Sequence, residues 1–371
     1  MVNIILNIKN YAIMQLLILL VTSCNKESSN EVVHITPEIE MSTADCVDHV
    51  EYVVLEKTDE CILSNVEVLR MNKDKIAVQS NRAIYIFNQQ GEYLSKVDKM
   101  GNASDEYIII NDFQIMDDEI YILSGLQNKI QKYSLDGDYI GAYVLDNSYK
   151  HFVFEKNNTI ILSSEQCNDK HFNFVRYDLS KKKNVGEIDE FEENQAMSFP
   201  YYNAFLNTDE AILVGHPFDY GIYSLQQNQI KKKIEFDFDT SDHLPQGNKN
   251  FMEIEERTKY SNVVRFLLSY SKVGKIQYLV YPLFCEYGIK TCLTRIGEDG
   301  SNATIKIGNK IDKTYPYFFM GNFLSLESNK LAMVTDASKL ISLERRNGMS
   351  YFTNNGITEE SNPILFFYYL K

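Results

Sequence analysis

The stretch KIAVQSNRAIYIFNQQGEYL (Lys75–Leu94) decides the fold, because it returns as EIYILSGLQNKIQKYSLDGDYI (Glu119–Ile140) further along the chain. Each copy reads as a strand, a polar turn, a second strand, a turn and a third strand. Ile76 recurs at Ile120, a step of 44 residues. A repeat of this length with several short strands in each copy predicts the blades of a β-propeller.

Two glycines support this interpretation. Gly91 lies in QQGEY and Gly137 in LDGDY, and each glycine follows a predicted strand. A tight hairpin needs a positive φ at its turn, which glycine adopts without a steric penalty. Apolar residues flank both turns on alternating faces, as in a sheet packed between two neighbours. One such sheet cannot bury both faces alone, so further copies must follow.

Three weaker copies follow, and a sixth begins at Asn329–Asp336. The sequence after that strand, ASKLISLERRNGMS, has a helical rather than a β pattern. The sixth blade therefore needs a strand from elsewhere. The three weaker copies pair Asn158–Glu165 with Phe172–Leu179, Glu210–Pro217 with Tyr220–Ile230, and Lys275–Phe284 with Ile289–Gly300.

Two segments could supply the missing strand: Asn362–Leu370 at the C-terminal end and His49–Glu56 near the other end. Pairing strands from both ends would close the ring and remove the exposed edges that promote aggregation. The alternative is a late β-hairpin at the C-terminal end. We predict an all-β, six-bladed β-propeller over residues 45–371, with four-stranded antiparallel blades and a ring closed by N- and C-terminal strands. The 25 Tyr and 21 Phe agree with this class, because both residues favour strands.

The N-terminal region predicts the compartment. The apolar run Ala12–Val21 is shorter than the roughly 20 residues that cross a membrane, and it suits a signal peptide. It leads into VTSC, which resembles a bacterial lipobox, in which the cysteine is lipidated after cleavage. The alternative is an ordinary cleaved signal with an incidental cysteine. We expect a lipoprotein signal peptide over residues 1–23, a lipid on Cys24 and a flexible tether over residues 24–44.

The segments VEYVVLEKTDECILSNVEVL, IYIFNQQGEYLSKVDKMGNASDEYIIINDFQI and NPILFFYYLK resemble the six-bladed β-propeller lipoproteins of gut Bacteroidetes, relatives of the NHL-repeat propellers. The resemblance covers nearly all the mature chain and is strongest over residues 47–145 and 360–371. It implies a lipid-anchored place in the cell envelope, at the outer membrane, and implies little about activity. Two elements of this chain differ from the pattern of that family. Ala103–Tyr107 replaces a Gly-Pro-Gly-Glu-Tyr element, and Ser80 and Ser124 stand where an Asp often follows the strand.

The charge of the chain argues against nucleic-acid binding. The net charge is −14, whereas phosphate binding needs concentrated Lys and Arg. The basic runs Lys181–Lys183 and Lys231–Lys233 are interpreted as solvated hairpins, and Glu187–Asn194 as a solvated loop. Asp237–Asp242 begins like a calcium loop but lacks the central Gly and the Glu at the twelfth position. With no His pair and no catalytic motif, we expect no metal and no cofactor.

The six cysteines leave five after lipidation. Cys285 and Cys292 lie on opposite arms of a predicted hairpin and could form a disulfide in an oxidising compartment. The alternative, that both are small buried hydrophobic residues, is favoured because cross-strand pairs strain a disulfide in most registers.

The connections between blades are rich in tyrosine. Its ring and hydroxyl suit the capture of sugars or peptides, so these segments form a candidate ligand platform. The alternative is that the aromatic residues pack between blades. A longer insertion, Ser241–Asn262, could act as a lid or a docking element. The platform residues are Tyr107, Tyr149, His151, Tyr201, Tyr202, Tyr315 and Tyr317.

The predicted function is that of a lipid-anchored, non-catalytic module that binds a glycan, peptide or protein beside a nutrient-uptake system. The alternative is a propeller enzyme, either a lyase or a lactonase-like hydrolase, with a cation in the central channel. Inward carboxylates and histidines around an ion would favour the enzyme. A wide mouth lined by aromatic residues would favour the binding module.

Overall fold

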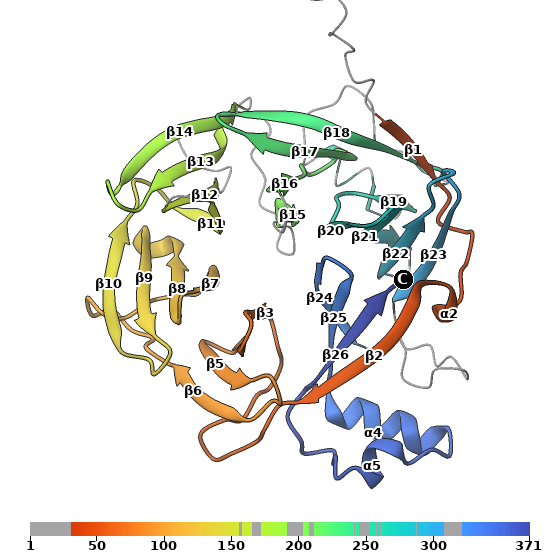
Figure 1. Cartoon of the computed structure of the whole chain (residues 1–371), viewed down its shortest axis with the longest axis horizontal. Coiled ribbons are helices and arrows are strands. Elements are labelled where there is room, and N and C mark those ends of the chain that lie inside the picture. The colour runs from red at the N-terminus through yellow and green to blue at the C-terminus, as the bar shows by residue number, and fades with distance from the viewer. Residues whose placement is uncertain are drawn as a thin grey trace, which may run out of the picture.

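The computed structural model describes residues 31–371 except 156–157, 165–171, 191–202, 208–210, 241, 243, 245–252, 255, 257, 260–261, 287 and 308–320. Its strands form six small, mainly antiparallel sheets arranged in a ring (Figure 1). This arrangement confirms the all-β, six-bladed β-propeller that the repeat predicts.

Blades 1 to 3 share one pattern, in which four strands follow each other from the centre of the ring to its rim. The repeated stretches fall on the second and third strands, as expected. Blade 1 contains β3 (Val68–Met71), β4 (Lys75–Ser80), β5 (Ala83–Asn88) and β6 (Tyr93–Val97); blade 2 contains β7 (Asp112–Met116), β8 (Glu119–Ser124), β9 (Lys129–Ser134) and β10 (Tyr139–Val144); blade 3 contains β11 (Tyr149–Glu155), β12 (Thr159–Ser164), β13 (Phe172–Asp178) and β14 (Lys183–Glu190).

Blades 4 and 5 keep this order with local changes. In blade 5 the hairpin β21–β22 is longer than its counterparts, and the short strand β19 pairs with the end of β21. Blade 4 contains β15 (Phe205–Asn207), β16 (Leu213–Val214), β17 (Gly221–Gln226) and β18 (Gln229–Phe238); blade 5 contains β20 (Ser269–Val273), β21 (Ile276–Cys285), β22 (Gly288–Ile296) and β23 (Asn302–Ile307), with β19 (Val263–Val264) beside β21.

Blade 6 joins the two ends of the chain. Its order is β24 (Asn322–Glu327), β25 (Lys330–Thr335), β26 (Ile364–Leu370) and β2 (Val47–Val54), with β26 paired to both neighbours. The prediction that both terminal segments close the ring is therefore confirmed. The segment after β25 forms the helices α4 (Ala337–Arg346) and α5 (Tyr351–Asn354), as its helical pattern indicates.

The first described residues wrap around the outside of the ring. Strand β1 (Glu31–Ile35) pairs in parallel with β18 as a fifth strand of blade 4. The chain then bonds to Thr304 at the edge of blade 5, forms helix α2 (Thr43–Cys46) and enters β2. The predicted flexible tether is therefore wrong from Glu31 onward, because edge pairing and the burial of Val33 and Ile35 hold this segment on the rim.

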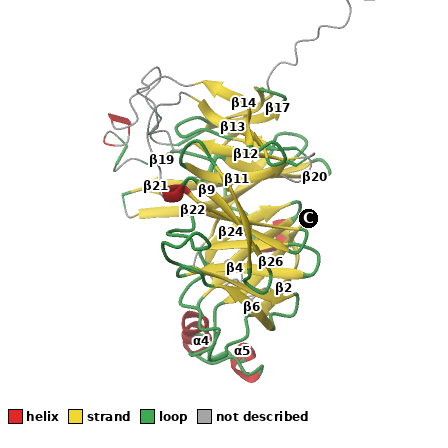
Figure 2. Ribbon diagram, turned by 90° about the vertical axis from the view of Figure 1, so that its left-hand side faces the viewer, coloured by secondary structure: helices red, strands yellow, loops and turns green. Residues whose placement is uncertain are grey.

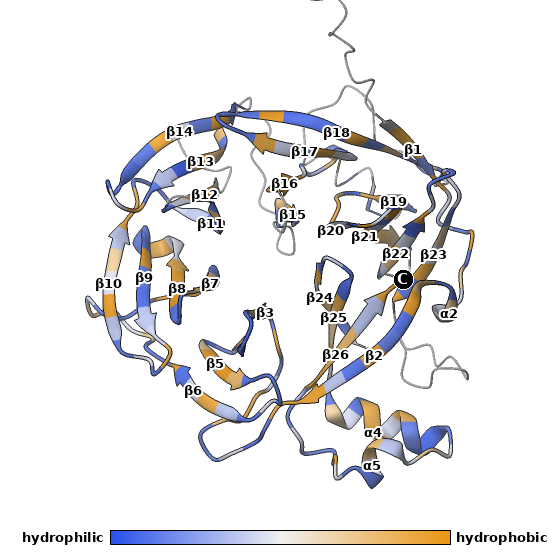
Figure 3. Cartoon of the chain, in the orientation of Figure 1, coloured by the Kyte–Doolittle hydropathy of each residue, from blue (hydrophilic) through white to orange (hydrophobic). Residues whose placement is uncertain are grey.

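The hydrophobic core consists of clusters between successive blades. Ile86 of blade 1 packs with Ile122 of blade 2 in one cluster, and Leu123 of blade 2 packs with Leu162 of blade 3 in the next. Each blade thus buries both faces, as the two-faced apolar pattern requires. Hydrophobic and hydrophilic residues alternate along the outer strands (Figure 3).

The two ends of the blades differ in their connections. Because neighbouring strands are antiparallel, the links between first and second strands and between third and fourth strands lie at one end, the short-turn face. Here residues 117–118 and 227–228 suffice to reverse the chain. The other links lie at the opposite end, the long-loop face, and include residues 98–111 and 336–363. Figure 2 shows the ring edge-on, so that its two faces lie to the left and right, with α4 and α5 beside its lower rim.

Both predicted turn glycines adopt the expected conformation. Gly91 and Gly137 each have a φ of 86°. A Cβ atom added to Gly91 would lie 2.3 Å from the carbonyl oxygen of Val54 in β2. The turn of blade 1 therefore needs glycine for its backbone conformation and for its contact with the closing blade.

Two charged runs lie in strands rather than in loops. Lys231–Lys233 belong to β18, and Glu187–Glu190 belong to β14, where Ile188 is buried. Alternating apolar residues place both runs on the rim of the ring. Lys181 and Lys182 do occupy a turn, as predicted, and the rest of the acidic run lies outside the described residues.

The hairpin of blade 5 settles the arrangement of Cys285 and Cys292. Cys285 lies opposite Gly288, whereas Cys292 lies opposite Tyr281, which comes four positions before Cys285 on β21. That separation is about 13 Å along a strand, well beyond the reach of a disulfide. Cys292 is buried and burial raises the pKa of its thiol to about 12, so this cysteine is a small hydrophobic core residue.

Candidate functional site

A polar cluster lies at the centre of the ring, where the inner strands of blades 1 to 3 meet. Arg70 comes from β3, Asp112 from β7 and His151 from β11. Nη2 of Arg70 donates to Oδ1 of Asp112 at 2.8 Å, and Nδ1 of His151 lies 3.7 Å from Oδ2 of Asp112. The inner strands pack directly against one another, so one polar side chain from each blade meets its neighbours here.

The carboxylate of Asp112 is fully engaged by hydrogen bonds. Besides Arg70, it accepts the backbone N–H of Phe113 at 2.8 Å and that of Phe152 at 3.0 Å. Burial alone would raise the pKa of Asp112, but the Arg70 charge, His151 and the Phe152 N–H hold it below its usual value. Asp112 therefore stays ionised and acts as a fixed anionic link between three blades.

Arg70 also ties blade 1 to blade 2 through the backbone. Its Nε donates to the carbonyl oxygen of Phe113 at 3.1 Å. Gln114 makes the same contact one blade further on, where its Nε2 donates to the carbonyl of Phe152 at 2.8 Å. Asn207 of blade 4 repeats it, with Nδ2 donating to Tyr270 of blade 5 at 2.8 Å. A polar side chain of one inner strand thus holds the next inner strand at three of the blade interfaces.

The side chains of Arg70 and His151 retain limited exposure, at 21% and 18%. They lie on strands that surround the axis of the ring (Figure 1). The cluster therefore presents a guanidinium and an imidazole, while its carboxylate is covered. Such a surface can donate hydrogen bonds to an anionic or carbonyl-bearing group, but it offers no free carboxylate as a general base.

Two of the predicted platform tyrosines are buried. Tyr107 has no exposed surface, and its hydroxyl donates to the carbonyl oxygens of Arg82 and Val97. Tyr149 is 1% exposed, and its hydroxyl donates to Oδ1 of Asp146 at 2.8 Å. For these two residues the platform interpretation is wrong and packing between blades holds, because the rings fill the blade interfaces.

The remaining platform residues divide into two groups. His151 lies in the central cluster and is partly exposed. The other four, and most of the insertion Ser241–Asn262, lie outside the described residues, so their part in a platform remains a prediction. These four are Tyr201, Tyr202, Tyr315 and Tyr317.

A second polar cluster joins blades 3 and 4 near the long-loop face. Nε2 of His216 lies 3.2 Å from Oδ2 of Asp189, which also accepts a hydrogen bond from Asn173. The His216 ring packs beside Tyr223, whose hydroxyl donates to Asp219. Asp189 has a φ of 63°, a conformation that few residues other than glycine adopt. The residue spacing gives no sign of this cluster, because its members come from separate strands and a connection of two blades.

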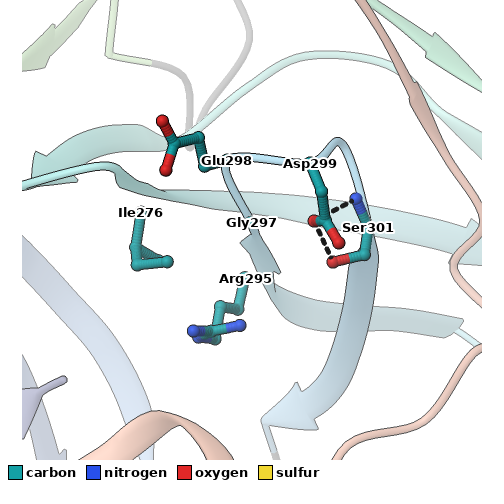
Figure 4. A pocket seen from close by; sticks show the side chains of 6 residues that line it. All are labelled: Ile276, Arg295, Gly297, Glu298, Asp299 and Ser301. Atoms are coloured by element: carbon teal, nitrogen blue, oxygen red, sulfur yellow. Dashed lines mark hydrogen bonds between the residues drawn. The ribbon is translucent and has the colours of Figure 1, made fainter.

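A shallow depression of about 520 Å³ lies at the short-turn face of blade 5 (Figure 4). Arg295 points into it from β22, and the turn after β22 forms its rim. Glu298 of that turn pairs with Lys275 at 2.6 Å, and Oδ1 of Asp299 accepts the N–H and hydroxyl of Ser301. These hydrogen bonds lower the pKa of Asp299. The acidic groups are thus occupied, which leaves Arg295 as the group that faces the depression.

Metal-ligand clusters and membrane-spanning helices are both missing from the described ranges. Within the ranges that the structure describes, no three His, Cys, Asp or Glu side chains converge as metal ligands would. No helix in this part of the chain has the length and apolar character needed to cross a membrane.

Two solved structures of bacterial proteins share this fold. A Bacteroides fragilis protein that is described as exported has 15% identity to this chain and a TM-score of 0.72. The match covers 92% of this chain and 99% of that protein. A member of the DUF4221 family from Bacteroides vulgatus has 11% identity and a TM-score of 0.54, over 88% and 97%. At these identities the likeness shows the fold alone.

No curated protein matches the chain. One family model, described as a domain of unknown function, DUF4934, matches residues 30–369. This match spans β1 on the rim, all six blades and the closing strand β26 up to Tyr369. The chain therefore belongs to the DUF4934 family.

Proposed function

We propose that this protein is a lipid-anchored propeller of the cell envelope that binds a glycan, peptide or protein at its long-loop face and does not catalyse a reaction. We also propose that the protein works beside a nutrient-uptake system. The difference between the two faces carries it. Tight turns close one face, whereas connections of up to 28 residues, 336–363, leave from the other. Loops held on a rigid scaffold are the usual place for binding residues.

Exposed apolar side chains on the long-loop face of blade 2 support this proposal. Leu126 is 73% exposed in the 3₁₀ helix Gly125–Gln127, and Ile109 is 44% exposed in the preceding connection. The backbone N–H of Ile108 donates to Gln127, so the two segments lie against each other. We call Ile109 and Leu126 the blade 2 patch. The engaged carboxylate of Asp112 also favours a binding role over the enzyme alternative.

The binding part of the proposal can be tested with a matched pair of variants. We expect Leu126→Asp to weaken at least tenfold a ligand found on a glycan or peptide array, because it charges the patch. Ile140 is also an exposed aliphatic residue of blade 2, but it follows the turn at the short-turn face. Ile140→Asp should change affinity less than twofold. The reverse pattern, with both variants folded, would place the site on the other face and contradict the proposal.

The anchor part rests on VTSC and on the compartment that it implies. The similar Bacteroides fragilis protein is described as exported, which agrees with an envelope location. We expect Cys24→Ala to move the protein from the membrane fraction to the soluble envelope fraction, because each buried CH₂ of an acyl chain contributes about 0.8 kcal/mol. Fractionation and labelling with a radioactive fatty acid measure this. Unlabelled wild type together with a variant that still sediments with membranes would refute the anchor.

A further inference from the structure

The two lysine runs lie on neighbouring parts of the rim. Lys181–Lys183 occupy the turn between β13 and β14 and the first residue of β14, and Lys231–Lys233 lie near the start of β18. Arg176 of blade 3 donates to Asn228 in the turn before β18. Gly186 of β14 is so close that an added Cβ would lie 2.5 Å from Oδ1 of Asn228. Both runs therefore lie toward the short-turn ends of the neighbouring outer strands β14 and β18, and we call this part of the rim the blade 3–4 corner.

Most of these lysines are not neutralised. Lys181 pairs with Asp178, and Lys232 pairs with Glu235 and covers the ring of Tyr223. The other four lysines are exposed, and none of them forms an ion pair within the described part of the chain. They stand out in a protein whose net charge is −14. We call these four, Lys182, Lys183, Lys231 and Lys233, the rim lysines.

The chain leaves the fold at the same corner. In the parallel pair β1–β18, Glu31 lies opposite Ile234 and Ile35 opposite Phe238. Glu31 therefore lies beside the middle of β18, at the residue that follows Lys231–Lys233. From Cys24 to Glu31 there are seven residue steps, which span at most about 25 Å when fully extended. A lipid on Cys24 would hold this corner, rather than the long-loop face, close to the membrane.

From this juxtaposition we propose that the rim lysines contact the anionic lipid headgroups of the membrane that holds the anchor. This proposal rests on the lipid anchor proposed above. Acyl chains combined with a basic surface give firmer attachment than the chains alone. Each lysine near an anionic membrane strengthens attachment about fivefold, and the effect fades within a Debye length. The contact turns the short-turn face toward the membrane and leaves the long-loop face open to ligands.

Lysine labelling on vesicles tests this orientation. The full-length lipidated protein is bound to vesicles of phosphatidylcholine alone or with phosphatidylglycerol, and a water-soluble amine reagent modifies exposed lysines. On the anionic vesicles we expect the rim lysines to react at least fivefold more slowly than in detergent. Lys99, Lys290 and Lys339, which are exposed in or next to the connections of the long-loop face, should change less than twofold. High salt should restore the reactivity of the rim lysines.

Matched variants provide the control. The triple variant Lys182→Gln, Lys183→Gln and Lys231→Gln should remove the protection of Lys233, whereas the control triple variant Lys99→Gln, Lys290→Gln and Lys339→Gln should leave it. Flotation with neutral vesicles reports the anchor alone. Failure to float would overturn the anchor and this inference together. Flotation with equal labelling of the rim lysines in detergent and on anionic vesicles would overturn this inference and leave the anchor standing.

Discussion

At the scale of single residues, Asp112 shows how a buried charge can serve the fold. Removing a carboxylate from water costs several kcal/mol, and only surrounding donors compensate for this. Arg70 and two backbone N–H groups supply them, and they come from three blades. The cluster therefore fixes the relative positions of these blades. It is an interblade link at the centre of the ring.

We expect Asp112→Asn to destabilise the protein by about 3 kcal/mol or more, because Arg70 would remain without its anion. Asp98→Asn is the matched control. Asp98 forms a half-exposed pair with Lys96, and losing such a pair costs about 0–1 kcal/mol. Thermal or urea unfolding at pH 7 measures both changes. Equal, small effects of the two substitutions would contradict a structural role for the buried carboxylate.

The pH dependence of Asp112 gives a second readout of the same substitution. Its pKa is lower in the folded protein than the unfolded value of about 3.9. Its contribution to stability is therefore complete above about pH 4 and is lost as pH falls through the folded pKa. The difference in melting temperature between wild type and Asp112→Asn should shrink below pH 4. A constant difference down to pH 3 would show that the charge is not the cause.

At the scale of strands and helices, the sequence predicts what side-chain patterns encode. Strands β4, β5, β8 and β9 follow from the alternation around Gly91 and Gly137, and α4 follows from its helical pattern. Strand β1 does not, because it joins the rim mainly through backbone hydrogen bonds that almost any sequence can form. The polar residues that precede β1 in the sequence favour the prediction of a flexible tether. Edge strands of this kind depend on the surface that they meet.

The candidate site is even harder to predict from the sequence, because its residues meet only in the folded ring. Arg70, Asp112 and His151 are about one blade apart along the chain, and only the closure of the ring brings them together. Tyr107 and Tyr149 show the converse, because tyrosine suits both a ligand surface and an interblade core. The sequence names the residue type, and the packing of neighbouring blades decides which of the two roles it takes.

At the scale of the whole molecule, closure depends on β26, which lies between β25 and β2. We expect Tyr368→Ala to cost about 3–5 kcal/mol, because this ring is fully buried between blades 5 and 6. Its neighbour on the same strand, Tyr369, stacks on His49 at the surface, so Tyr369→Ala should cost less than about 1.5 kcal/mol. Unfolding curves of the two variants test this. If both substitutions cost equally little while the protein stays monomeric, β26 is not the strand that holds the ring closed.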